Sequence, residues 1–417
     1  MRFSLPYGRS MVSGSIPKSC VAHYVRPRRW RIDRRRDPVK TALDCPIGLP
    51  RLRQLARHSR RAVIVTCDKT RGLPSHVTIP VVLRQLKSGG LDRDRVEVLV
   101  ATGLHKGETM ADVEERFGDE VIEDVTVSIH DSDDSGQQIL LGRLSSGTPL
   151  YLNRTVAQSD LVIIESTIEP HFFAGFTGGS KVILPGVAGT ETILGNHSWR
   201  NIDDPRSRYG MIDSPVRAEA DESLRHLRKL FALNLVLDSR KRIVHASSGD
   251  AVASFRAAAD AVDRHSRVRV ASRPGVVITT NGGYPLDRNL YQCVKGIAVP
   301  EEILRGDSKI IMVAECVDGV GHEHFLNLLT SDLPSLLYDR LRDSPIAVTD
   351  QWEVQVLCRI LRRNPVWFVT RPELRSEIEK MHLRYATTID EALASAGATK
   401  RKQVLVVPYG PSTILSM

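Results

Sequence analysis

The sequence predicts two α/β domains with parallel sheets, and three features point to this fold class. Short apolar segments of strand length alternate with longer amphipathic segments along the 417-residue chain. Several apolar segments, such as residues 62–65, run directly into charged or glycine-rich residues. The chain length suits two domains, each with its own core. We therefore expect ligand-binding groups where the strands end, because open parallel sheets bind ligands at their carboxyl edges.

Composition and charge exclude several other classes of protein. Hydrophobic residues make up 41% of the chain and charged residues 26%, and no apolar run reaches the roughly 20 residues that a membrane-spanning helix needs. The net charge of +9 is partly local, because seven arginines crowd residues 26–36. Trp30 and Ile32 alternate with these arginines, so we interpret the segment as a half-exposed strand and loop. A nucleic-acid site and a transit peptide are the alternatives.

The cysteine spacing indicates a cytoplasmic protein. The six cysteines lie far apart and none forms a CxxC pair, so neither a zinc site nor a disulfide framework is indicated. Reduced, mostly buried thiols are typical of the cytoplasm.

The first strong strand, residues 62–65, ends in a segment rich in side chains that bind ligands. Asp68, Lys69, Thr70 and Arg71 follow it within a few residues. Charged and hydroxyl groups at the carboxyl end of a parallel strand are well placed to bind a small molecule. A capped turn is the alternative interpretation, because Asp–Arg pairs also cap turns.

The next strand, residues 96–100, repeats this arrangement. His105 follows it between two glycines, and a helix is expected to start near Thr109. His171 occupies the corresponding loop after a third strand, residues 161–164. A histidine that plays no chemical part is the usual alternative at one such position, but two strand-end histidines together favour catalysis.

Residues 165–197 hold the densest group of candidate residues. A glycine-rich loop of Thr177, Gly178, Gly179 and Ser180 ends at Lys181. Glycines allow a ligand close to the backbone, hydroxyls donate hydrogen bonds, and a lysine supplies a charge or an amine nucleophile. We interpret the loop as an anion site that resembles a phosphate cradle, with a plain tight turn as the alternative. It does not match the GxxxxGK[ST] pattern.

The second half of the chain repeats the strand–helix plan. Residues 276–279, 309–314 and 365–369 read as strands, and the helix after the first of them carries Tyr291, Gln292 and Lys295. Tyr291 and Lys295, four residues apart, share one helix face. We place the first domain at residues 1–272, completed by a C-terminal strand within 398–417. The second domain spans 273–397, and both are Rossmann-like, with the active site in the cleft between them.

Five spaced motifs together resemble one family. They are DKTR, GLHKG, EPHFFAGFTGGSK followed by PG and NH, NGGYPLDRNLYQCVKG, and DQW, in this order between Leu5 and Gly410. The set is similar to the nickel-dependent lactate racemase family, with its wider group of 2-hydroxyacid racemases and epimerases. Gly72 stands where the family pattern has proline, close to the expected substrate pocket, so the acid is lactate or a related 2-hydroxyacid.

The resemblance implies a covalently bound cofactor, the nickel-pincer nucleotide. This pyridinium mononucleotide holds nickel through two thio-carboxyl arms and a ring carbon. Lys181 matches the lysine that attaches it, and His197 matches the histidine that binds the nickel. The residues implied to line the cofactor are Asp68, Lys69, Thr70, Arg71, Thr177, Gly178, Gly179, Ser180, Gln292 and Lys295. Separate enzymes must make the cofactor.

The resemblance also implies a reaction, inversion of C2 by proton-coupled hydride transfer to the cofactor. His105 and His171 match a pair of acid–base histidines, one for each face of the substrate. Arg71 and Lys295 match groups that bind the carboxylate, and Tyr291 and Trp352 match pocket residues.

Three alternatives from other classes stay open at this point. A zinc or iron enzyme would use His105, His171 and His197, but then Lys181 has no role. A dehydrogenase with free NAD would need a GxGxxG motif after a strand, and the sequence has none. A non-catalytic nucleotide-binding protein would not need two strand-end histidines.

Overall fold

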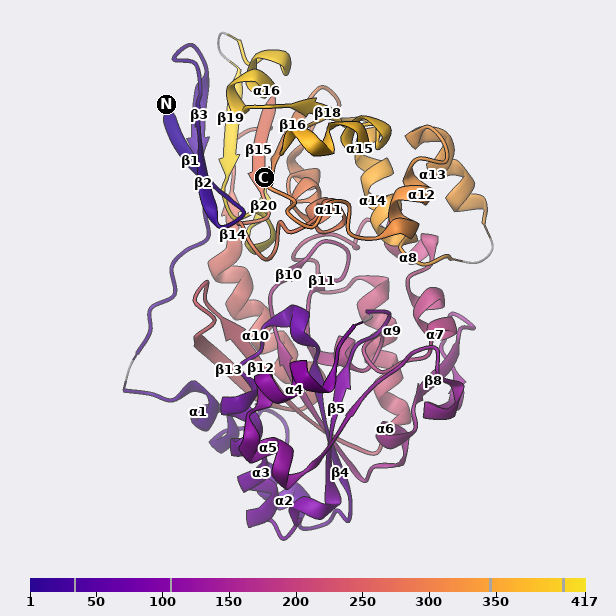
Figure 1. Ribbon diagram of the computed structural model, residues 1–417. Coiled ribbons are helices and arrows are strands. Elements are labelled where there is room, and N and C mark those ends of the chain that lie inside the picture. Colours follow the sequence, from indigo (N-terminus) through magenta and orange to yellow (C-terminus); the bar gives the residue numbers. More distant parts are fainter. Residues whose placement is uncertain (34, 106, 345–346, 400–401) are drawn as a thin grey trace.

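The computed structural model describes residues 1–33, 35–105, 107–344, 347–399 and 402–417. It consists of two α/β bodies, each built on a six-stranded sheet, and both termini lie on the body drawn uppermost (Figure 1). The predicted fold class is confirmed. In the described parts of the chain, no helix combines the length and the apolar character needed to cross a membrane.

The first sheet has the strand order β13-β12-β9-β4-β5-β6, and β13 is its one antiparallel strand. The central strands β4 and β9 are buried along their whole length, because apolar clusters cover both faces of the sheet. The strands are β4 (Ala62–Cys67), β5 (Val96–Ala101), β6 (Thr126–Ile129), β9 (Leu161–Thr167), β12 (Lys229–Leu237) and β13 (Ile243–Gly249). The helices are α1 (Pro38–Asp44), α2 (Leu52–Ala56), α3 (Ser75–Ser88), α4 (Met110–Phe117), α5 (Asp119–Asp124), α6 (Arg154–Gln158), α7 (Thr190–Asn196), α9 (Pro215–Ser223) and α10 (Ala251–Ser266).

The second sheet has the order β18-β17-β16-β15-β19-β3, with all strands parallel. The strands are β3 (Val21–Tyr24), β15 (Val276–Thr280), β16 (Lys309–Val313), β17 (Val366–Val369), β18 (Arg384–Ala386) and β19 (Gln403–Val407). The helices are α11 (Leu290–Ala298), α12 (Glu323–Leu329), α13 (Pro334–Asp343), α14 (Gln351–Leu361), α15 (Arg375–Lys380) and α16 (Ile389–Ser395). Two-stranded pairs complete the fold: β1 (Arg2–Tyr7) with β2 (Ser10–Ser15), β7 (Gln138–Arg143) with β8 (Pro149–Asn153), β10 (Pro170–His171) with β11 (Gly175–Phe176), and β14 (Arg267–Arg269) with β20 (Ile414–Ser416).

β19 belongs to the second sheet, so the expectation that a C-terminal strand completes the first domain does not hold for β19, whereas β20 pairs with β14 inside residues 1–272. β19 pairs with β15 along Val276–Thr279. On its other side β19 pairs with β3, so the N-terminal segment also joins the second sheet. The apolar pattern identified β19 as a strand correctly, but a run of apolar residues carries no information about which sheet it joins.

The arginine-rich segment is not a strand either. Residues 25–33 form neither helix nor strand, and the Trp30 ring stacks on His265 at the end of α10, with ring centroids 3.5 Å apart. Trp30 therefore packs against His265 and anchors the linker of residues 25–33, and its alternation with arginines does not indicate a strand.

One short segment of the first half holds the two bodies together. α8 (Trp199–Asp203) follows His197 and packs on α14. Gln355 donates to the Trp199 carbonyl at 2.9 Å, and Arg359 donates to the Ile202 carbonyl at 2.9 Å. Tyr209 donates to the Lys295 carbonyl at 3.0 Å. These bonds place the segment that carries His197 against the second body.

Candidate active site

Asp68 and His105 pair at the carboxyl ends of two adjacent strands. β4 and β5 run parallel and in register to Cys67 and Ala101, so the loops that follow them meet. His105 Nδ1 lies 2.6 Å from Asp68 Oδ2. The aspartate side chain is 5% exposed and the histidine side chain 43%, so the carboxylate is buried behind an accessible imidazole.

The carboxyl group of Asp68 is ionised at neutral pH. Burial alone would raise its pKa, but the hydrogen bond and charge of His105, the charge of Arg71 and the Thr70 hydroxyl outweigh burial and lower the pKa to about 2. An ionised carboxylate only accepts hydrogen bonds, so the hydrogen between the two side chains belongs to Nδ1 of His105.

Lys69 and Arg71 lie in the turn η1 (Lys69–Arg71) and point to different partners. The Lys69 ammonium donates to the Gly107 carbonyl at 2.6 Å and lies 2.8 Å from Asp112 of α4. Arg71 Nη1 lies 3.7 Å from Glu169 Oε1. Beyond the effect of burial, the Arg71 charge helps to lower the pKa of Lys181 and that of His171. Arg71 therefore faces the other predicted residues, and Lys69 is bound elsewhere.

Glu165 fixes the base of these loops, a role that sequence reasoning missed. Its side chain is fully buried on β9, and it accepts hydrogen bonds from Thr66 of β4 at 2.5 Å, from Ser75 of α3 at 3.0 Å, and from Thr78. Burial raises the pKa of Glu165, and the three hydroxyl donors offset part of the rise. The carboxyl group thus ties two strands to the helix that follows the Asp68 loop.

Phe173 lies between three of the predicted site residues, the catalytic His171, the metal ligand His197 and the cofactor lysine Lys181. Its ring centroid is 4.4 Å from that of His171 and 5.2 Å from that of His197, both edge to face. The Lys181 ammonium lies 5.2 Å from the same centroid. Phe173 is 3% exposed. Three predicted residues from separate segments therefore surround one aromatic ring, which sequence reasoning did not single out.

The basic groups of this cluster tend towards their neutral forms. Burial, followed by the charges of Arg217, Arg71 and Lys295, lowers the pKa of Lys181 well below its ordinary value. Burial followed by the charge of Lys181 does the same for the pKa of His197. An uncharged amine is the nucleophilic form of lysine, and an uncharged imidazole is the form that binds metals.

The glycine-rich loop faces the protein interior rather than a ligand. Thr177 Oγ1 donates to the Thr167 carbonyl at 2.8 Å, and the Gly179 N–H donates to Ser166 Oγ at 3.0 Å. Ser180 Oγ donates to Asp221 Oδ1 at 2.5 Å. The phosphate-cradle interpretation predicted free donors at these atoms, but the protein itself uses them, and the Asp221 carboxylate would repel a phosphate.

The two central glycines allow close packing. Gly178 and Gly179 have φ values of +69° and +59°, which favour glycine. A Cβ on Gly179 would lie 2.7 Å from the Phe255 ring of α10, and one on Gly178 would lie 2.6 Å from the Thr167 carbonyl. The tight-turn alternative thus describes this loop.

A buried arginine that the sequence did not reveal holds the loop. Arg217 of α9 is 1% exposed and donates to the carbonyls of Phe176 at 2.5 Å and Gly178 at 2.7 Å. Its guanidinium carbon lies 4.0 Å from the Phe255 ring centroid. The loop, α9 and α10 are therefore locked together just before Lys181.

Lys295 and Gln292 bring the second body to the site. Lys295 Nζ donates to Gln292 Oε1 at 2.6 Å, and its charge helps to lower the pKa of His171 after burial. Glu353 of α14 is 2% exposed, and its Oε2 has no hydrogen-bond partner among the described residues. Burial raises the pKa of Glu353 to about 8, although Lys295 opposes the rise. Sequence reasoning missed Glu353, although it is the one acidic residue within α14.

The two predicted aromatic residues, both buried, have different neighbours. The Trp352 ring centroid is 5.0 Å from that of His197, edge to face, so this contact joins the two bodies at the predicted metal ligand. Tyr291 stacks on His322 with centroids 4.0 Å apart, and His322 Nδ1 lies 3.2 Å from Asp350. Trp352 contacts the central cluster directly, and Tyr291 lies beside a second His–Asp pair.

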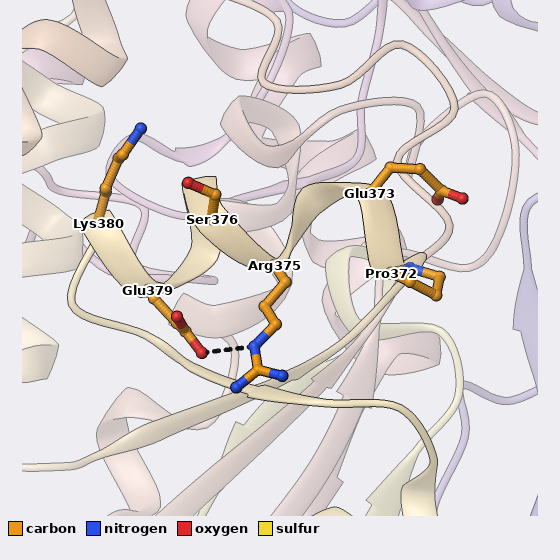
Figure 2. Close-up of a pocket in the computed structure, with 6 residues that line it drawn as sticks. All are labelled: Pro372, Glu373, Arg375, Ser376, Glu379 and Lys380. Carbon is orange, nitrogen blue, oxygen red and sulfur yellow. Dashed lines mark hydrogen bonds and ion pairs between the residues drawn. The ribbon is translucent and has the colours of Figure 1, made fainter.

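Two surface hollows lie away from this cluster. One follows η7 (Pro372–Leu374) and α15, where the ion pair of Arg375 and Glu379 lines it (Figure 2). The other lies at the amino end of the first sheet, beside Arg61 and Arg95. Neither is lined by a predicted site residue.

The residues present fit the implied nickel group. Nδ1 of His197 is buried and has no hydrogen-bond partner in the described parts of the chain, so this imidazole has an uncommitted nitrogen. No group of three or more His, Cys, Asp or Glu side chains among the described residues is arranged to hold a metal ion. A metal at His197 would thus need donors from the cofactor, and a sulfur-and-carbon pincer supplies them.

Comparison with protein families gives matches across most of the chain. Residues 7–210 match the lactate racemase N-terminal domain, and residues 270–415 match the lactate racemase C-terminal domain. The second match includes β19, in agreement with its place in the second sheet.

Individual relatives cover almost all of the sequence. The lactate racemase of Thermoanaerobacterium thermosaccharolyticum is 35% identical over 422 residues, which span 99% of this chain and 98% of that protein. The lactate racemase of Lactiplantibacillus plantarum is 37% identical over 385 residues, 91% of this chain and 90% of that protein.

Solved structures show the same fold. The lactate racemase apoprotein from T. thermosaccharolyticum superposes with a TM-score of 0.93 at 34% identity and full coverage of both chains. A protein from Thermotoga maritima shares the fold at 16% identity, with a TM-score of 0.65 over 88% of this chain and 97% of that one.

Proposed function

The chain belongs to the lactate racemase family, and from this premise we propose that it is an isomerase that inverts C2 of a 2-hydroxyacid, lactate or a related acid. The observation that carries the proposal is the cluster around Phe173. His171, Lys181 and His197 gather there from three segments of the first half, and Trp352 joins them from the second.

We assign the cofactor of this reaction to the nickel-pincer nucleotide, attached at Lys181 with its nickel bound by His197. When bound, this group supplies an electrophilic ring that accepts a hydride. A lowered Lys181 pKa supports attachment, because the uncharged amine is the form that makes a covalent bond. Enzymes that make the cofactor are therefore needed as partners. The free cysteines support a separate proposal, a cytoplasmic location.

The chain itself must move the hydroxyl proton. The hydrogen on C2, next to the carboxylate, is hard to remove as a proton, which favours its removal as a hydride. The hydroxyl proton must then leave as well, because a carbonyl group forms at C2. His105 is suited to accept it, because Asp68 holds Nδ1 and leaves Nε2 free. Inversion needs a proton-transfer group on each face of the substrate, and we assign His171 to the second face.

The substrate carboxylate would bind between the two bodies. Arg71 from the first and Lys295 from the second are the cations we assign to it, and a guanidinium can hold a carboxylate through two hydrogen bonds. Arg71 is 25% exposed and only loosely paired with Glu169, at 3.7 Å, so it is available to a ligand. Gln292 holds the Lys295 ammonium in place.

The zinc or iron alternative has less support. It would need His105, His171 and His197 around one ion, and the described residues contain no such metal-binding group. It would also leave the cation-flanked Lys181 without a purpose.

Co-expression with the cofactor-making enzymes tests the proposal. We expect a mass increment on Lys181, bound nickel and inversion of L-lactate or another 2-hydroxyacid. The lactate racemase of T. thermosaccharolyticum serves as the loading control, and Lys181→Arg should abolish the mass increment. A preparation that carries neither adduct nor nickel, while the control protein is loaded, would refute the cofactor assignment. A loaded protein that inverts no 2-hydroxyacid would refute the activity.

A further inference from the structure

A lysine from a neighbouring turn lies against the loop that carries Asp68 and Arg71. Residues 238–242 form the turn between β12 and β13. β12 runs parallel to β9, and β9 runs parallel to β4, so this turn and the loop after β4 lie at the same edge of the first sheet. From the turn Lys241 reaches Gly72, because a Cβ placed on Gly72 would lie 3.1 Å from both Cε and Nζ of Lys241. The end of the Lys241 side chain therefore lies beside the residue that follows Arg71.

The backbone at Gly72 leaves the space that Lys241 occupies. Gly72 has a φ of +59° at the end of η1, a left-handed conformation that favours glycine. Proline, with a φ of about −65°, cannot adopt it. Any side chain at this position would have to displace the Lys241 ammonium. The departure of Gly72 from the family pattern, which has proline, therefore goes together with the presence of a lysine in its place.

Lys241 itself occupies a turn position that favours glycine. Its φ is +59°, which is unfavourable for a residue with a Cβ. Asp238 holds the turn in this shape: its Oδ1 accepts from the N–H groups of Arg240 and Arg242 at 2.9 and 3.0 Å, and its Oδ2 accepts from the Arg242 guanidinium. The chain thus has a lysine in a strained position, and such positions cluster at functional sites.

The charge of the Lys241 ammonium is available to a ligand. The side chain is exposed, and the acid of its own turn, Asp238, is paired with Arg242. Arg71 is 25% exposed and its nearest carboxylate partner, Glu169, is 3.7 Å away. Within the described ranges, no carboxylate lies within hydrogen-bond distance of either cation. Two uncommitted positive charges therefore lie next to each other at the loop that follows β4.

We propose that Lys241 is a specificity-determining residue that binds a second carboxylate of the substrate, so that this protein inverts a 2-hydroxydicarboxylic acid in preference to lactate. The inference rests on the proposed function and narrows its substrate class. Arg71 and Lys295 bind the carboxylate next to C2, and Lys241 binds the distal one. An ammonium donates charge-assisted hydrogen bonds to a carboxylate, whereas the methyl group of lactate cannot accept them.

Kinetics of the loaded enzyme with L-malate and L-lactate test this role. We expect the wild-type kcat/KM to be at least about tenfold higher for malate, because a hydrogen bond between charged groups is worth about tenfold or more in binding. Lys241→Met keeps an unbranched side chain beside Gly72 and removes the charge. It should lower the ratio of the two kcat/KM values at least about tenfold, mainly through the KM for malate. Lys241→Arg keeps the charge and should keep most of the preference.

Two controls separate this contact from other effects of charge and size. Lys229→Met removes a positive charge at the opposite end of β12 and should leave the malate-to-lactate ratio unchanged. The malate monoamide, in which an uncharged amide replaces the distal carboxylate, has almost the size of malate. Wild type should prefer malate to this amide, and Lys241→Met should not. A ratio of about one in wild type, or a ratio that Lys241→Met leaves unchanged, would overturn the proposal.

Binding to the protein without cofactor distinguishes a failure of this proposal from a failure of the proposed function. Isothermal titration calorimetry should give a Kd for L-malate at least about tenfold lower for wild type than for Lys241→Met. Equal dissociation constants would overturn the second carboxylate site, whether or not the protein is a racemase. A loaded wild-type enzyme that inverts neither acid would instead contradict the proposed function, and the two dissociation constants would then decide the role of Lys241.

Discussion

The loops after β4 and β5 and the loop that leads to Lys181 border the same sheet, yet they use their polar side chains in opposite ways. In the first pair, Asp68 and His105 bind each other and leave an imidazole edge accessible. In the second, Thr177 and Ser180 are 3% and 1% exposed, and their hydroxyls bond to the protein. The Asp68 and His105 loops leave an imidazole accessible to a ligand, whereas the glycine-rich loop is packed against the protein next to Lys181.

The difference lies in what stands behind each loop. Behind the glycine loop lie α9 and α10, with Arg217 and Phe255 pressed against the backbone. The His105 side chain, in contrast, is 43% exposed, and its partner in the pair is the carboxylate of Asp68. A glycine-rich loop therefore indicates that another group packs closely on the backbone. In this protein that group is the Phe255 side chain of α10 and not a phosphate.

Removal of the imidazole at position 105 should have the largest effect on activity. His105→Ala removes the proposed base, and general base catalysis is worth about 10²–10⁴-fold in rate. We expect kcat to fall by this factor while the mass adduct on Lys181 and the bound nickel remain. His58→Ala, at an exposed histidine away from the site, is the matched control and should leave kcat unchanged. Full activity of His105→Ala would show that the accessible loop is not the catalytic one.

A methyl group in the glycine loop should reduce stability instead. Gly179→Ala combines a left-handed alanine with an overpacked contact on Phe255, which together cost about 2–5 kcal/mol. Gly90→Ala has a similar positive φ, but its Cβ would meet no atom within 4 Å, so it should cost about 1 kcal/mol. Urea unfolding of both variants without cofactor measures the difference. Equal stabilities, combined with lost cofactor attachment in Gly179→Ala alone, would restore the phosphate-cradle interpretation.

The same comparison shows how far sequence reasoning reached. Strand ends are visible as apolar runs that stop, and β4, β5 and β9 lie where the sequence placed them. Since parallel neighbours end at one edge, the pairing of Asp68 with His105 follows from that pattern. The direction of the side chains in the glycine-rich loop does not follow from the pattern, because the loop has the same sequence whether Thr177 and Ser180 face a ligand or the core.

Long-range partners were also beyond the sequence. Arg217 sits in an ordinary polar helix sequence, and nothing local marks it as buried under the glycine loop. β19 was recognised as a strand but assigned to the wrong sheet, because its neighbours β3 and β15 lie about 380 and 130 residues away along the chain. Contacts of this kind are set by the whole topology rather than by any local pattern.

A third experiment tests whether the Asp68–His105 pair contributes to the free energy of unfolding. The folded pKa of Asp68, about 2, lies below the ordinary carboxyl value of 3.8, so its ionised form stabilises the folded state above pH 4. This contribution, about 2 kcal/mol, should disappear as the pH falls from about 5 to 2. Asp68→Asn should therefore unfold more easily than wild type at pH 7, and the gap between the two should close towards pH 3. A gap that stays constant with pH would show that the carboxylate has no stabilising partner.

The smallest effect on stability and on cofactor attachment is expected for Lys69. The sequence predicted this residue in the cofactor site, but in the structure its ammonium group contacts Asp112 and the Gly107 carbonyl. Its ammonium pairs with Asp112 on the surface of α4, and an exposed ion pair contributes about 0.2–1 kcal/mol. Lys69→Ala should thus lower the free energy of unfolding by less than about 1 kcal/mol. Because Arg71, two residues on, faces the site instead, cofactor attachment at Lys181 should stay within about twofold of wild type, as read by intact mass. A tenfold loss of attachment in Lys69→Ala, with stability unchanged, would mean that Lys69 leaves Asp112 when the cofactor binds. The division between accessible and structural loops would then hold for the protein without cofactor and not for the loaded enzyme.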